Sequence, residues 1–211
     1  TFSFDTYYNP RRMNFCALRV LNDDRVEAGK GFGIHPHKNM EIISIPLKGK
    51  LKHGDSNKNS RTITIGDIQT MSAGTGIYHS EMNGSDTEPV EFLQIWVMPE
   101  KLNTPPAYQD YDIRPFLRKN ELALIVSPDG DAPAKMLQQT WFSIGEIEAG
   151  KKIGYHMHQS HAGVYIFVIE GEVKVDDTVL SRRDGMGVYD THSFELETLK
   201  DSHILLMEVP M

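Results

Sequence analysis

Several features that mark particular protein classes are scarce or missing in this chain of 211 residues. Cys16 is the only cysteine, so no internal disulfide can form. This fits a reducing compartment, and we expect a cytoplasmic protein. No apolar run approaches the roughly 20 residues that a membrane-spanning helix needs, so we expect no membrane partner.

Basic residues are also fewer than acidic residues. The sequence has 22 lysines and arginines against 29 aspartates and glutamates, which gives a formal net charge of -7. No basic stripe offsets this excess locally. Because nucleic acid repels an acidic surface, we expect no direct contact with DNA or RNA.

Helical periodicity is weak throughout, and the best helical candidate, residues 114–126, is ambiguous. Strand signals dominate instead, as short β-branched or aromatic runs bounded by Gly, Asp, Asn or Pro. The clearest are TITI (62–65), EFLQIWVM (91–98), GVYIFVIEGEVKV (163–175) and HILLMEV (203–209). Strands at this spacing predict an all-β sandwich or barrel.

An internal repeat gives the clearest view of the organisation. HPH (35–37) and HMH (156–158) are each followed by a β-rich run that ends at a glycine, Gly49 or Gly171. A duplicated unit predicts two similar antiparallel β-barrels.

We place these barrels at residues 1–112 and 113–211. The segment PEKLNTPPAYQDYDIRP (99–115) between them contains four prolines and little periodicity. It predicts a surface crossover.

The first copy contains a candidate metal site. His35 and His37 point to the same face of an extended strand, and His79 and Glu81 repeat that spacing after a glycine-rich turn. Three imidazoles and one carboxylate suit Fe(II), Mn, Co, Ni, Cu or Zn. An octahedral ion would keep two positions open, for a substrate oxygen and a small second ligand.

Glu41 competes with Glu81 for the fourth ligand position. It lies four residues after His37 and shares its face if the strand stays regular. Spacing alone leaves both carboxylates open.

The pairing of HPH with HSE in a duplicated β-barrel resembles the cupin superfamily, and more closely the pirin family, in particular the bacterial pirin-like proteins. The resembling stretches cover the amino-terminal half almost continuously: TFSFDTYYNP (1–10), LRVLNDD (18–24), GFGIHPHKNMEI (31–42), LKHGDS (51–56), MSAGTGIYHSEMN (71–83) and LQIWVMP (93–99). Pirins are bicupins, so the resemblance implies two cupin-type barrels arranged face to face. Relatives carry some tens of residues before the first stretch, and we expect such a segment here.

The resemblance also implies one divalent transition metal in the amino-terminal barrel, with iron favoured over Mn, Co, Ni, Cu and Zn. The ligands it implies are His35, His37, His79 and Glu81. Glu41 then supports the ligands without binding the metal. His53, with Asp55 in KHGDS, is predicted to support a ligand imidazole by hydrogen bonding, although an ordinary polar turn fits equally well.

Four apolar side chains are candidates for the wall of a pocket that holds a flat aromatic substrate: Phe32, Met71, Ile77 and Trp96. Each also fits as an ordinary core residue of a β-barrel.

The second copy keeps His156 and His158, and His192 follows later. Ala162 and Gly163 stand where the cupin pattern needs a carboxylate. We therefore predict a degenerate barrel, with a second metal at these histidines as the alternative.

The resemblance implies a metal-dependent dioxygenase of the quercetin 2,3-dioxygenase type. Its substrates would be dioxygen and a small flavonol-like aromatic, and Glu81 would be both ligand and catalytic base. We expect a monomer. The alternative is a non-catalytic metal-binding regulator or redox sensor that docks on a partner protein, and a third reading is a metal-free cupin.

Overall fold

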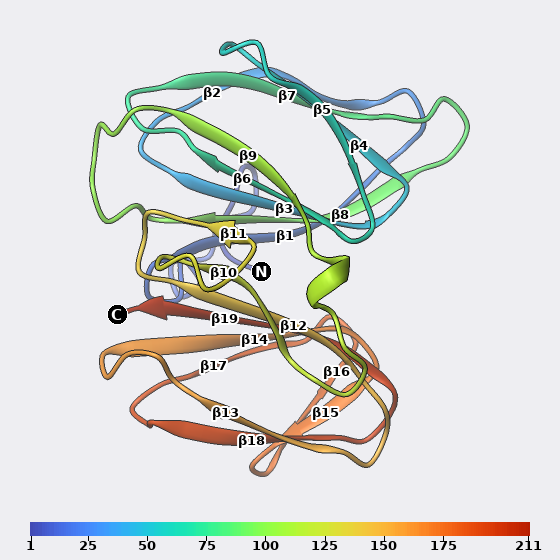
Figure 1. Cartoon of the computed structure of the whole chain (residues 1–211), viewed down its shortest axis with the longest axis vertical. Coiled ribbons are helices and arrows are strands. Elements are labelled where there is room, and N and C mark those ends of the chain that lie inside the picture. The colour runs from blue at the N-terminus through green and yellow to red at the C-terminus, as the bar shows by residue number, and fades with distance from the viewer. The chain divides into compact units, whose positions relative to one another are not determined.

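The computed structural model describes all 211 residues and consists of β-strands joined by short turns, with no α-helix (Figure 1). The only helical element is the 3-10 turn η1 (Arg114–Phe116), so the chain has no helix of the length and apolarity needed to cross a membrane.

Two compact units make up the chain. The first comprises Thr1–Asn14, Leu18–Arg114 and Pro133–Gln138, and the second comprises Phe15–Ala17, Pro115–Ala132 and Gln139–Met211. The main run of the first unit thus ends at Arg114, whereas the sequence predicts the boundary after residue 112.

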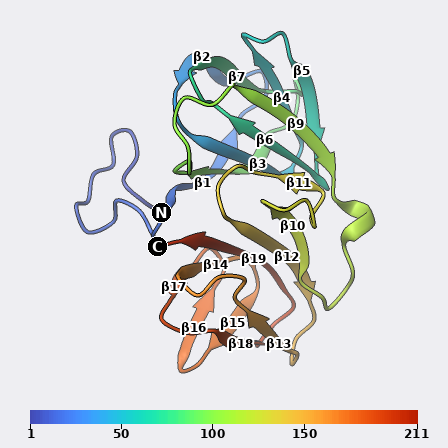
Figure 2. The same cartoon turned by 60° about the vertical axis from the view of Figure 1, so that its left-hand side comes forward.

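The strands of the first unit form two antiparallel sheets, ordered β1-β8-β3-β6-β9 and β2-β7-β4-β5. Their bounds are β1 (Leu18–Val26), β2 (Gly31–His37), β3 (Glu41–Lys48), β4 (Lys50–Asp55), β5 (Ser60–Thr64), β6 (Asp67–Ser72), β7 (Ile77–Asn83), β8 (Val90–Val97) and β9 (Ala107–Asp112). The short strand β11 (Ala134–Lys135) also belongs to this unit. Before β1 the chain forms a loop with a bridge between Phe4 and Tyr7 (Figure 2).

The second unit repeats this topology, with β10-β12-β19-β14-β17 in one sheet and β13-β18-β15-β16 in the other. The bounds are β10 (Ala123–Ser127), β12 (Trp141–Ile147), β13 (Lys152–His156), β14 (Ala162–Glu170), β15 (Glu172–Val175), β16 (Thr178–Ser181), β17 (Gly185–Val188), β18 (Ser193–Thr198) and β19 (Ser202–Pro210). The order β12-β19-β14-β17 matches β1-β8-β3-β6. The predicted all-β fold with a duplicated cupin-type barrel is confirmed.

Equivalent glycines end the central strand of each unit. Gly49 separates β3 from β4 and Gly171 separates β14 from β15, with φ angles of +76° and +92°. A left-handed backbone favours glycine at both places. The predicted run 163–175 is therefore two strands joined at Gly171.

The middle of the chain contains two strands that the sequence did not predict. The ambiguous helical candidate, residues 114–126, contains η1 and then strand β10. The segment 99–115 is more than a crossover, because β9 pairs with β6 as an edge strand. Tyr108 of β9 stacks on the buried His53, which gives this polar strand its anchor in the barrel.

The interior of the first barrel has an apolar cluster at each end. One contains Leu51, Ile63, Val90 and Phe92, and the other contains Ile42, Met71, Ala73 and Ile77. Along β8, Phe92 packs in the first cluster, Trp96 packs against the second, and Gln94 lies between them. Polar side chains therefore occupy the middle of this barrel.

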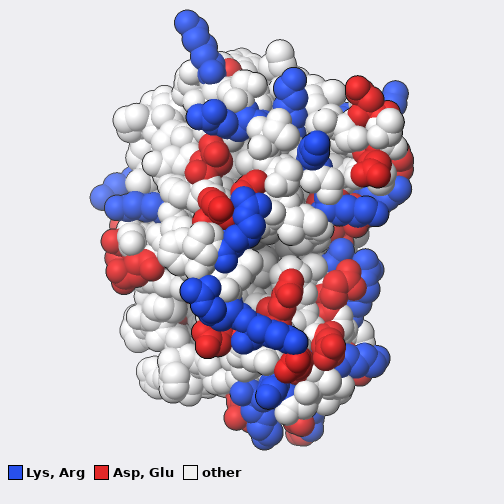
Figure 3. All heavy atoms as spheres, turned by 45° about the vertical axis from the view of Figure 1, so that its right-hand side comes forward, with Lys and Arg blue, Asp and Glu red and all other residues white.

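The surface carries charges of both signs. On the face shown in Figure 3, acidic and basic side chains are interspersed, without a continuous basic stripe. Such mixing leaves that face without a large field of one sign.

Candidate metal centre

Strands β2 and β7 bring three histidines together inside the first barrel. In their antiparallel register, His35 lies opposite His79, and His37 lies opposite Ile77. A ligand atom from each of His35, His37 and His79 lies within 4.8 Å of the others. The predicted histidine set is therefore a real cluster in space.

The closest approach in this cluster fits two ligands of one ion. His35 Nε2 and His79 Nε2 lie 2.9 Å apart, and His35 Nδ1 lies 2.7 Å from the carbonyl oxygen of Gly33. A carbonyl only accepts, so Nδ1 carries the proton and Nε2 presents its lone pair toward His79. Two metal–nitrogen bonds of about 2.1 Å at right angles would separate their nitrogens by about 3 Å.

Burial keeps His37 and His79 in the neutral form that binds metals. Burial, together with the neighbouring His35, lowers the pKa of His37 to about 4. Burial and the neighbouring imidazoles lower the pKa of His79 to about 3. His37 Nε2 is buried without a hydrogen-bond partner, which is costly unless something else binds it. The donor set therefore fits a divalent ion.

Glu81 lies beside His79 but does not join the three-histidine group. Its buried carboxylate falls in a second group of possible ligands, with His53 and His79, whose donor atoms also lie within 4.8 Å of one another. The Ser44 hydroxyl lies 3.0 Å from its Oε1, and the Gln94 amide donates to its Oε2. Burial raises the pKa of Glu81 to about 7, although the Ser44 contact acts against the shift.

His53 is fully buried and held on several sides. Its Nε2 lies 3.1 Å from Asp55 Oδ2, and its Nδ1 lies 3.3 Å from the side-chain nitrogen of Gln69. The Tyr108 ring stacks on it with centroids 4.4 Å apart, and the ring of His79 lies 5.3 Å away. The structure thus brings the rings of His53 and His79 together, but the hydrogen-bond partners of His53 are Asp55 and Gln69 and not the His79 imidazole.

Glu41 is not brought to the histidines. Its Oε2 accepts a hydrogen bond of 3.0 Å from the backbone nitrogen of Leu137. The next residue, Ile42, packs in the interior cluster, and side chains alternate along a strand. Glu41 therefore points out of the barrel and fastens the segment 133–138.

The predicted pocket residues divide into two sets. Met71 and Ile77 are buried in one apolar cluster, Trp96 packs against it, and the Trp96 ring meets the His37 ring edge to face at 4.8 Å. These three form an apolar wall beside His37. Phe32 lies opposite Glu81 in the register but is 43% exposed.

A hollow of about 380 Å³ lies along strands β2 and β7. Ile34, Tyr78 and His79 are among the residues that line it. It reaches His79 of the cluster, while its other walls belong mainly to the β4–β5 hairpin.

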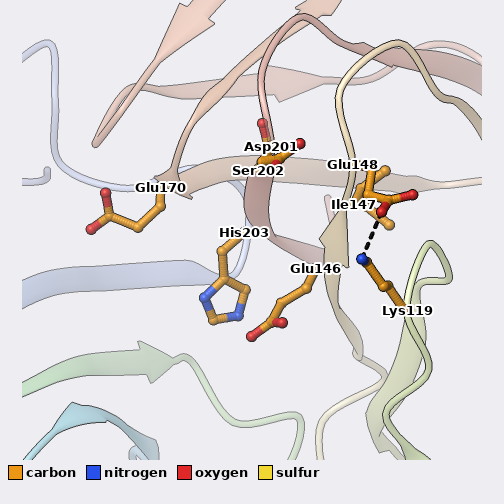
Figure 4. A pocket seen from close by; sticks show the side chains of 8 residues that line it. All are labelled: Lys119, Glu146, Ile147, Glu148, Glu170, Asp201, Ser202 and His203. Carbon is orange, nitrogen blue, oxygen red and sulfur yellow. Dashed lines mark ion pairs between the residues drawn. The ribbon is translucent and has the colours of Figure 1, made fainter.

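Another hollow, of about 260 Å³, lies in the second unit (Figure 4). Glu146 and Glu170 flank His203 there, and Lys119 forms an ion pair of 2.6 Å with Glu148. Both groups of three close metal donors lie in the first unit instead. This acidic hollow is therefore not part of the candidate centre.

The second histidine pair is placed differently from the first. In β13, Tyr155 points inward opposite Phe194, with ring centroids 5.4 Å apart, while His156 is exposed. His158 lies beyond the strand, and its Nδ1 lies 2.9 Å from the buried carboxylate of Glu208. The inward side chains at this point of β13 and β18 are thus an aromatic pair and not two histidines.

Sequence reasoning missed four polar side chains that surround Glu81 and His53: Ser44, Gln69, Gln94 and Tyr108. A usable signal exists for two of them. Ser44 and Gln94 each interrupt an apolar strand at an inward position. A lone polar residue there indicates a buried hydrogen-bonding partner.

Comparisons with protein families match both halves of the chain. The family model described as Pirin matches residues 1–97, and one described as Quercetinase C-terminal cupin domain matches residues 124–209. The protein named Quercetin 2,3-dioxygenase from Escherichia coli (strain K12) is 39% identical over 215 residues, which cover 100% of this chain and 90% of the relative. A pirin-like protein from Caulobacter vibrioides is 34% identical, over 98% of this chain and 89% of its own length.

Solved structures agree with these sequence matches. The crystal structure of YhhW from Escherichia coli has a TM-score of 0.93 and 38% identity, over 99% of this chain and 88% of that one. A structure of the same bacterial pirin in complex with nickel(II) also has a TM-score of 0.93, with 37% identity, over 100% of this chain and 90% of that one.

Proposed function

This chain belongs to the pirin family, and we propose that it is a metal-dependent dioxygenase of the quercetin 2,3-dioxygenase type, which opens the central ring of a flavonol-like aromatic substrate. The observation that carries the proposal is the convergence of His35, His37 and His79 inside the first barrel. The name of the Escherichia coli relative supports the reaction type.

We propose one divalent transition metal, held by His35, His37, His79 and Glu81. Iron remains the favoured metal, and the nickel(II) complex of the similar YhhW supports a bound divalent ion. To bind together with the histidines, the Glu81 carboxylate would turn from Ser44 and Gln94 toward the three-histidine group. Ser44 and Gln94 thus hold the carboxylate beside the three-histidine group by hydrogen bonding.

When bound, the ion would lower the pKa of a coordinated substrate hydroxyl and supply the chemistry for reaction with dioxygen. The protein contributes orientation, exclusion of water and proton transfer. Gly33 fixes the tautomer of His35 through its carbonyl oxygen. The wall that contains Met71, Ile77 and Trp96 keeps water from the face of His37.

Glu81 is the proposed base. Its carboxylate oxygen would accept the proton of the substrate 3-hydroxyl, leaving the electron pair on the substrate oxygen. When the carboxylate is not bound to the metal, its contacts with Ser44 and Gln94 keep it in one orientation. A positioned, buried carboxylate is suited to this transfer.

The proposal is tested by reconstituting the purified protein with Fe(II), Mn, Ni or Cu in turn and mixing it with quercetin in air. We expect the flavonol absorbance to fall with at least one metal. His79→Ala removes a proposed ligand that neither His35 nor His37 can replace, so we expect activity to drop by at least about 100-fold.

The matched control is His161→Ala, which removes an exposed histidine of the second unit and should leave the rate unchanged. If no metal supports loss of the absorbance in the unmodified protein, the proposed reaction is wrong. Equal activity of His79→Ala and the unmodified protein would remove the proposed centre.

A second function is supported by exposed apolar residues on the same strands. Ile34 is 81% exposed and Tyr78 is 57% exposed, on β2 and β7 respectively. Such residues suit docking of a partner protein by a metal-binding regulator. That function predicts metal binding without turnover of any flavonol, so the same assay separates the two.

A further inference from the structure

The first barrel contains a second set of metal donors that the proposed centre does not fully use. His53, His79 and Glu81 are all buried, and one donor atom of each lies within 4.8 Å of the others. In the register of β4 and β7, His53 lies opposite Glu81. Glu81 follows His79 by two residues on β7. The pair of His53 and Glu81 therefore lies next to the pair of His35 and His79.

His53 is oriented as a ligand imidazole would be. The carboxylate of Asp55 accepts hydrogen bonds from the backbone nitrogens of Asn57 and Asn59, at 2.9 Å and 3.0 Å, and from the Asn59 side chain at 2.8 Å. Since this carboxylate accepts, the Nε2 of His53 at 3.1 Å must donate to it.

The lone pair of His53 is therefore on Nδ1, where only the amide nitrogen of Gln69 approaches, at 3.3 Å. Metal-binding histidines almost always donate their other ring N–H to a carboxylate or carbonyl in this way.

The two other donors are also available on this side. His79 Nδ1 is buried and has no hydrogen-bond partner, while its Nε2 faces His35. Glu81 stays out of the three-histidine group and falls in the group with His53. Two imidazoles and one carboxylate form a donor set that holds zinc in proteins.

We propose that His53, His79 and Glu81 form a second, deeper position for a divalent ion such as Zn²⁺, Co²⁺ or Ni²⁺. It shares His79 and Glu81 with the proposed four-ligand centre, so a single ion occupies one position or the other. The inference rests on the proposed metal centre, but it requires no turnover.

The test uses the double variant His35→Ala/His37→Ala, which dismantles the three-histidine position and leaves the deeper set intact. Co²⁺ binding is measured by equilibrium dialysis and by the visible absorption of the bound ion. We expect the double variant to keep one equivalent of Co²⁺, with affinity about tenfold to 100-fold below that of the unmodified protein.

Adding His53→Gln to the double variant should abolish this binding. Adding Asp55→Asn, which leaves the three donors in place, should weaken it by about 10- to 100-fold. Adding His161→Ala instead should change nothing, because that histidine is exposed in the other unit. Circular dichroism checks that each variant is folded.

Two outcomes would overturn the deeper position. One is a folded double variant that binds no Co²⁺ above the level of its His53→Gln derivative, and the other is binding that Asp55→Asn leaves unaltered. Failure of the proposed function would look different. The unmodified protein would then bind no Co²⁺, or would show no turnover of a flavonol.

Discussion

At the scale of single residues, Asp24 shows how a half-buried carboxylate couples stability to pH. Burial, reinforced by the charge of Asp23, raises the pKa of Asp24 to about 6. The folded state therefore holds this proton more tightly than the unfolded state. The resulting stabilisation is complete below the unfolded pKa near 3.8 and is lost as pH rises through about 6.

Asp24→Asn should accordingly raise the melting temperature at pH 8, since the neutral amide avoids burying a charge. We expect a rise on the order of 2–5 °C at pH 8 and little change at pH 4. Thermal unfolding of the metal-free protein at both values measures it. The exposed Asp86→Asn is the control, and a larger gain at pH 4 than at pH 8 would contradict the sign.

Residue spacing predicted the three histidines because alternation along a strand is a strong geometric rule. Counted from His37, the same rule placed Glu41 on the wrong face. His37 ends β2 and Glu41 begins β3, so alternation along one strand does not relate the two residues. The hydrogen-bond partners of Glu81 come from β3 and β8. Such cross-strand contacts depend on register, which one sequence does not reveal.

At the scale of elements, the turn after β14 requires a glycine. Gly171 has φ +92°, and an added Cβ would lie 2.3 Å from the carbonyl oxygen of Asp201. Both the backbone angle and the contact disfavour any side chain there. The turn that starts β15 therefore depends on glycine.

Gly171→Ala should destabilise the protein by on the order of 3 kcal/mol, combining backbone strain with a steric clash. Gly130→Ala is the matched comparison, because Gly130 has φ +88° but nothing within 4 Å of the added Cβ. We expect it to cost about 1 kcal/mol. Urea unfolding measures both, and equal losses would show that the close approach to Asp201 is unimportant.

Apolar strands were predicted well, because runs rich in β-branched residues have few alternatives to a sheet. Strand β9 was missed because AYQDYD has almost no apolar alternation, and its anchor is the stacking of Tyr108 on His53. In β13 the repeat HMH suggested inward histidines, but the inward position is Tyr155. A similar motif can thus shift by one residue against its strand.

At the scale of the whole molecule, two units share one topology but differ inside. The first barrel has polar side chains between two apolar clusters, and both groups of close metal donors lie there. The second has a continuous apolar core that includes Tyr155, Ile166 and Leu196. Duplication preserved the strand order, while the interior chemistry diverged.

The central claim is that the first barrel holds the metal through its histidines. Anomalous X-ray scattering from crystals of the metal-loaded protein, recorded at the absorption edge of the metal, tests it most directly. We predict one dominant peak within about 2.5 Å of ring nitrogens of His79 and at least one other interior histidine. A dominant peak at His158 and Glu208, or none in the first barrel at full metal content, would contradict it.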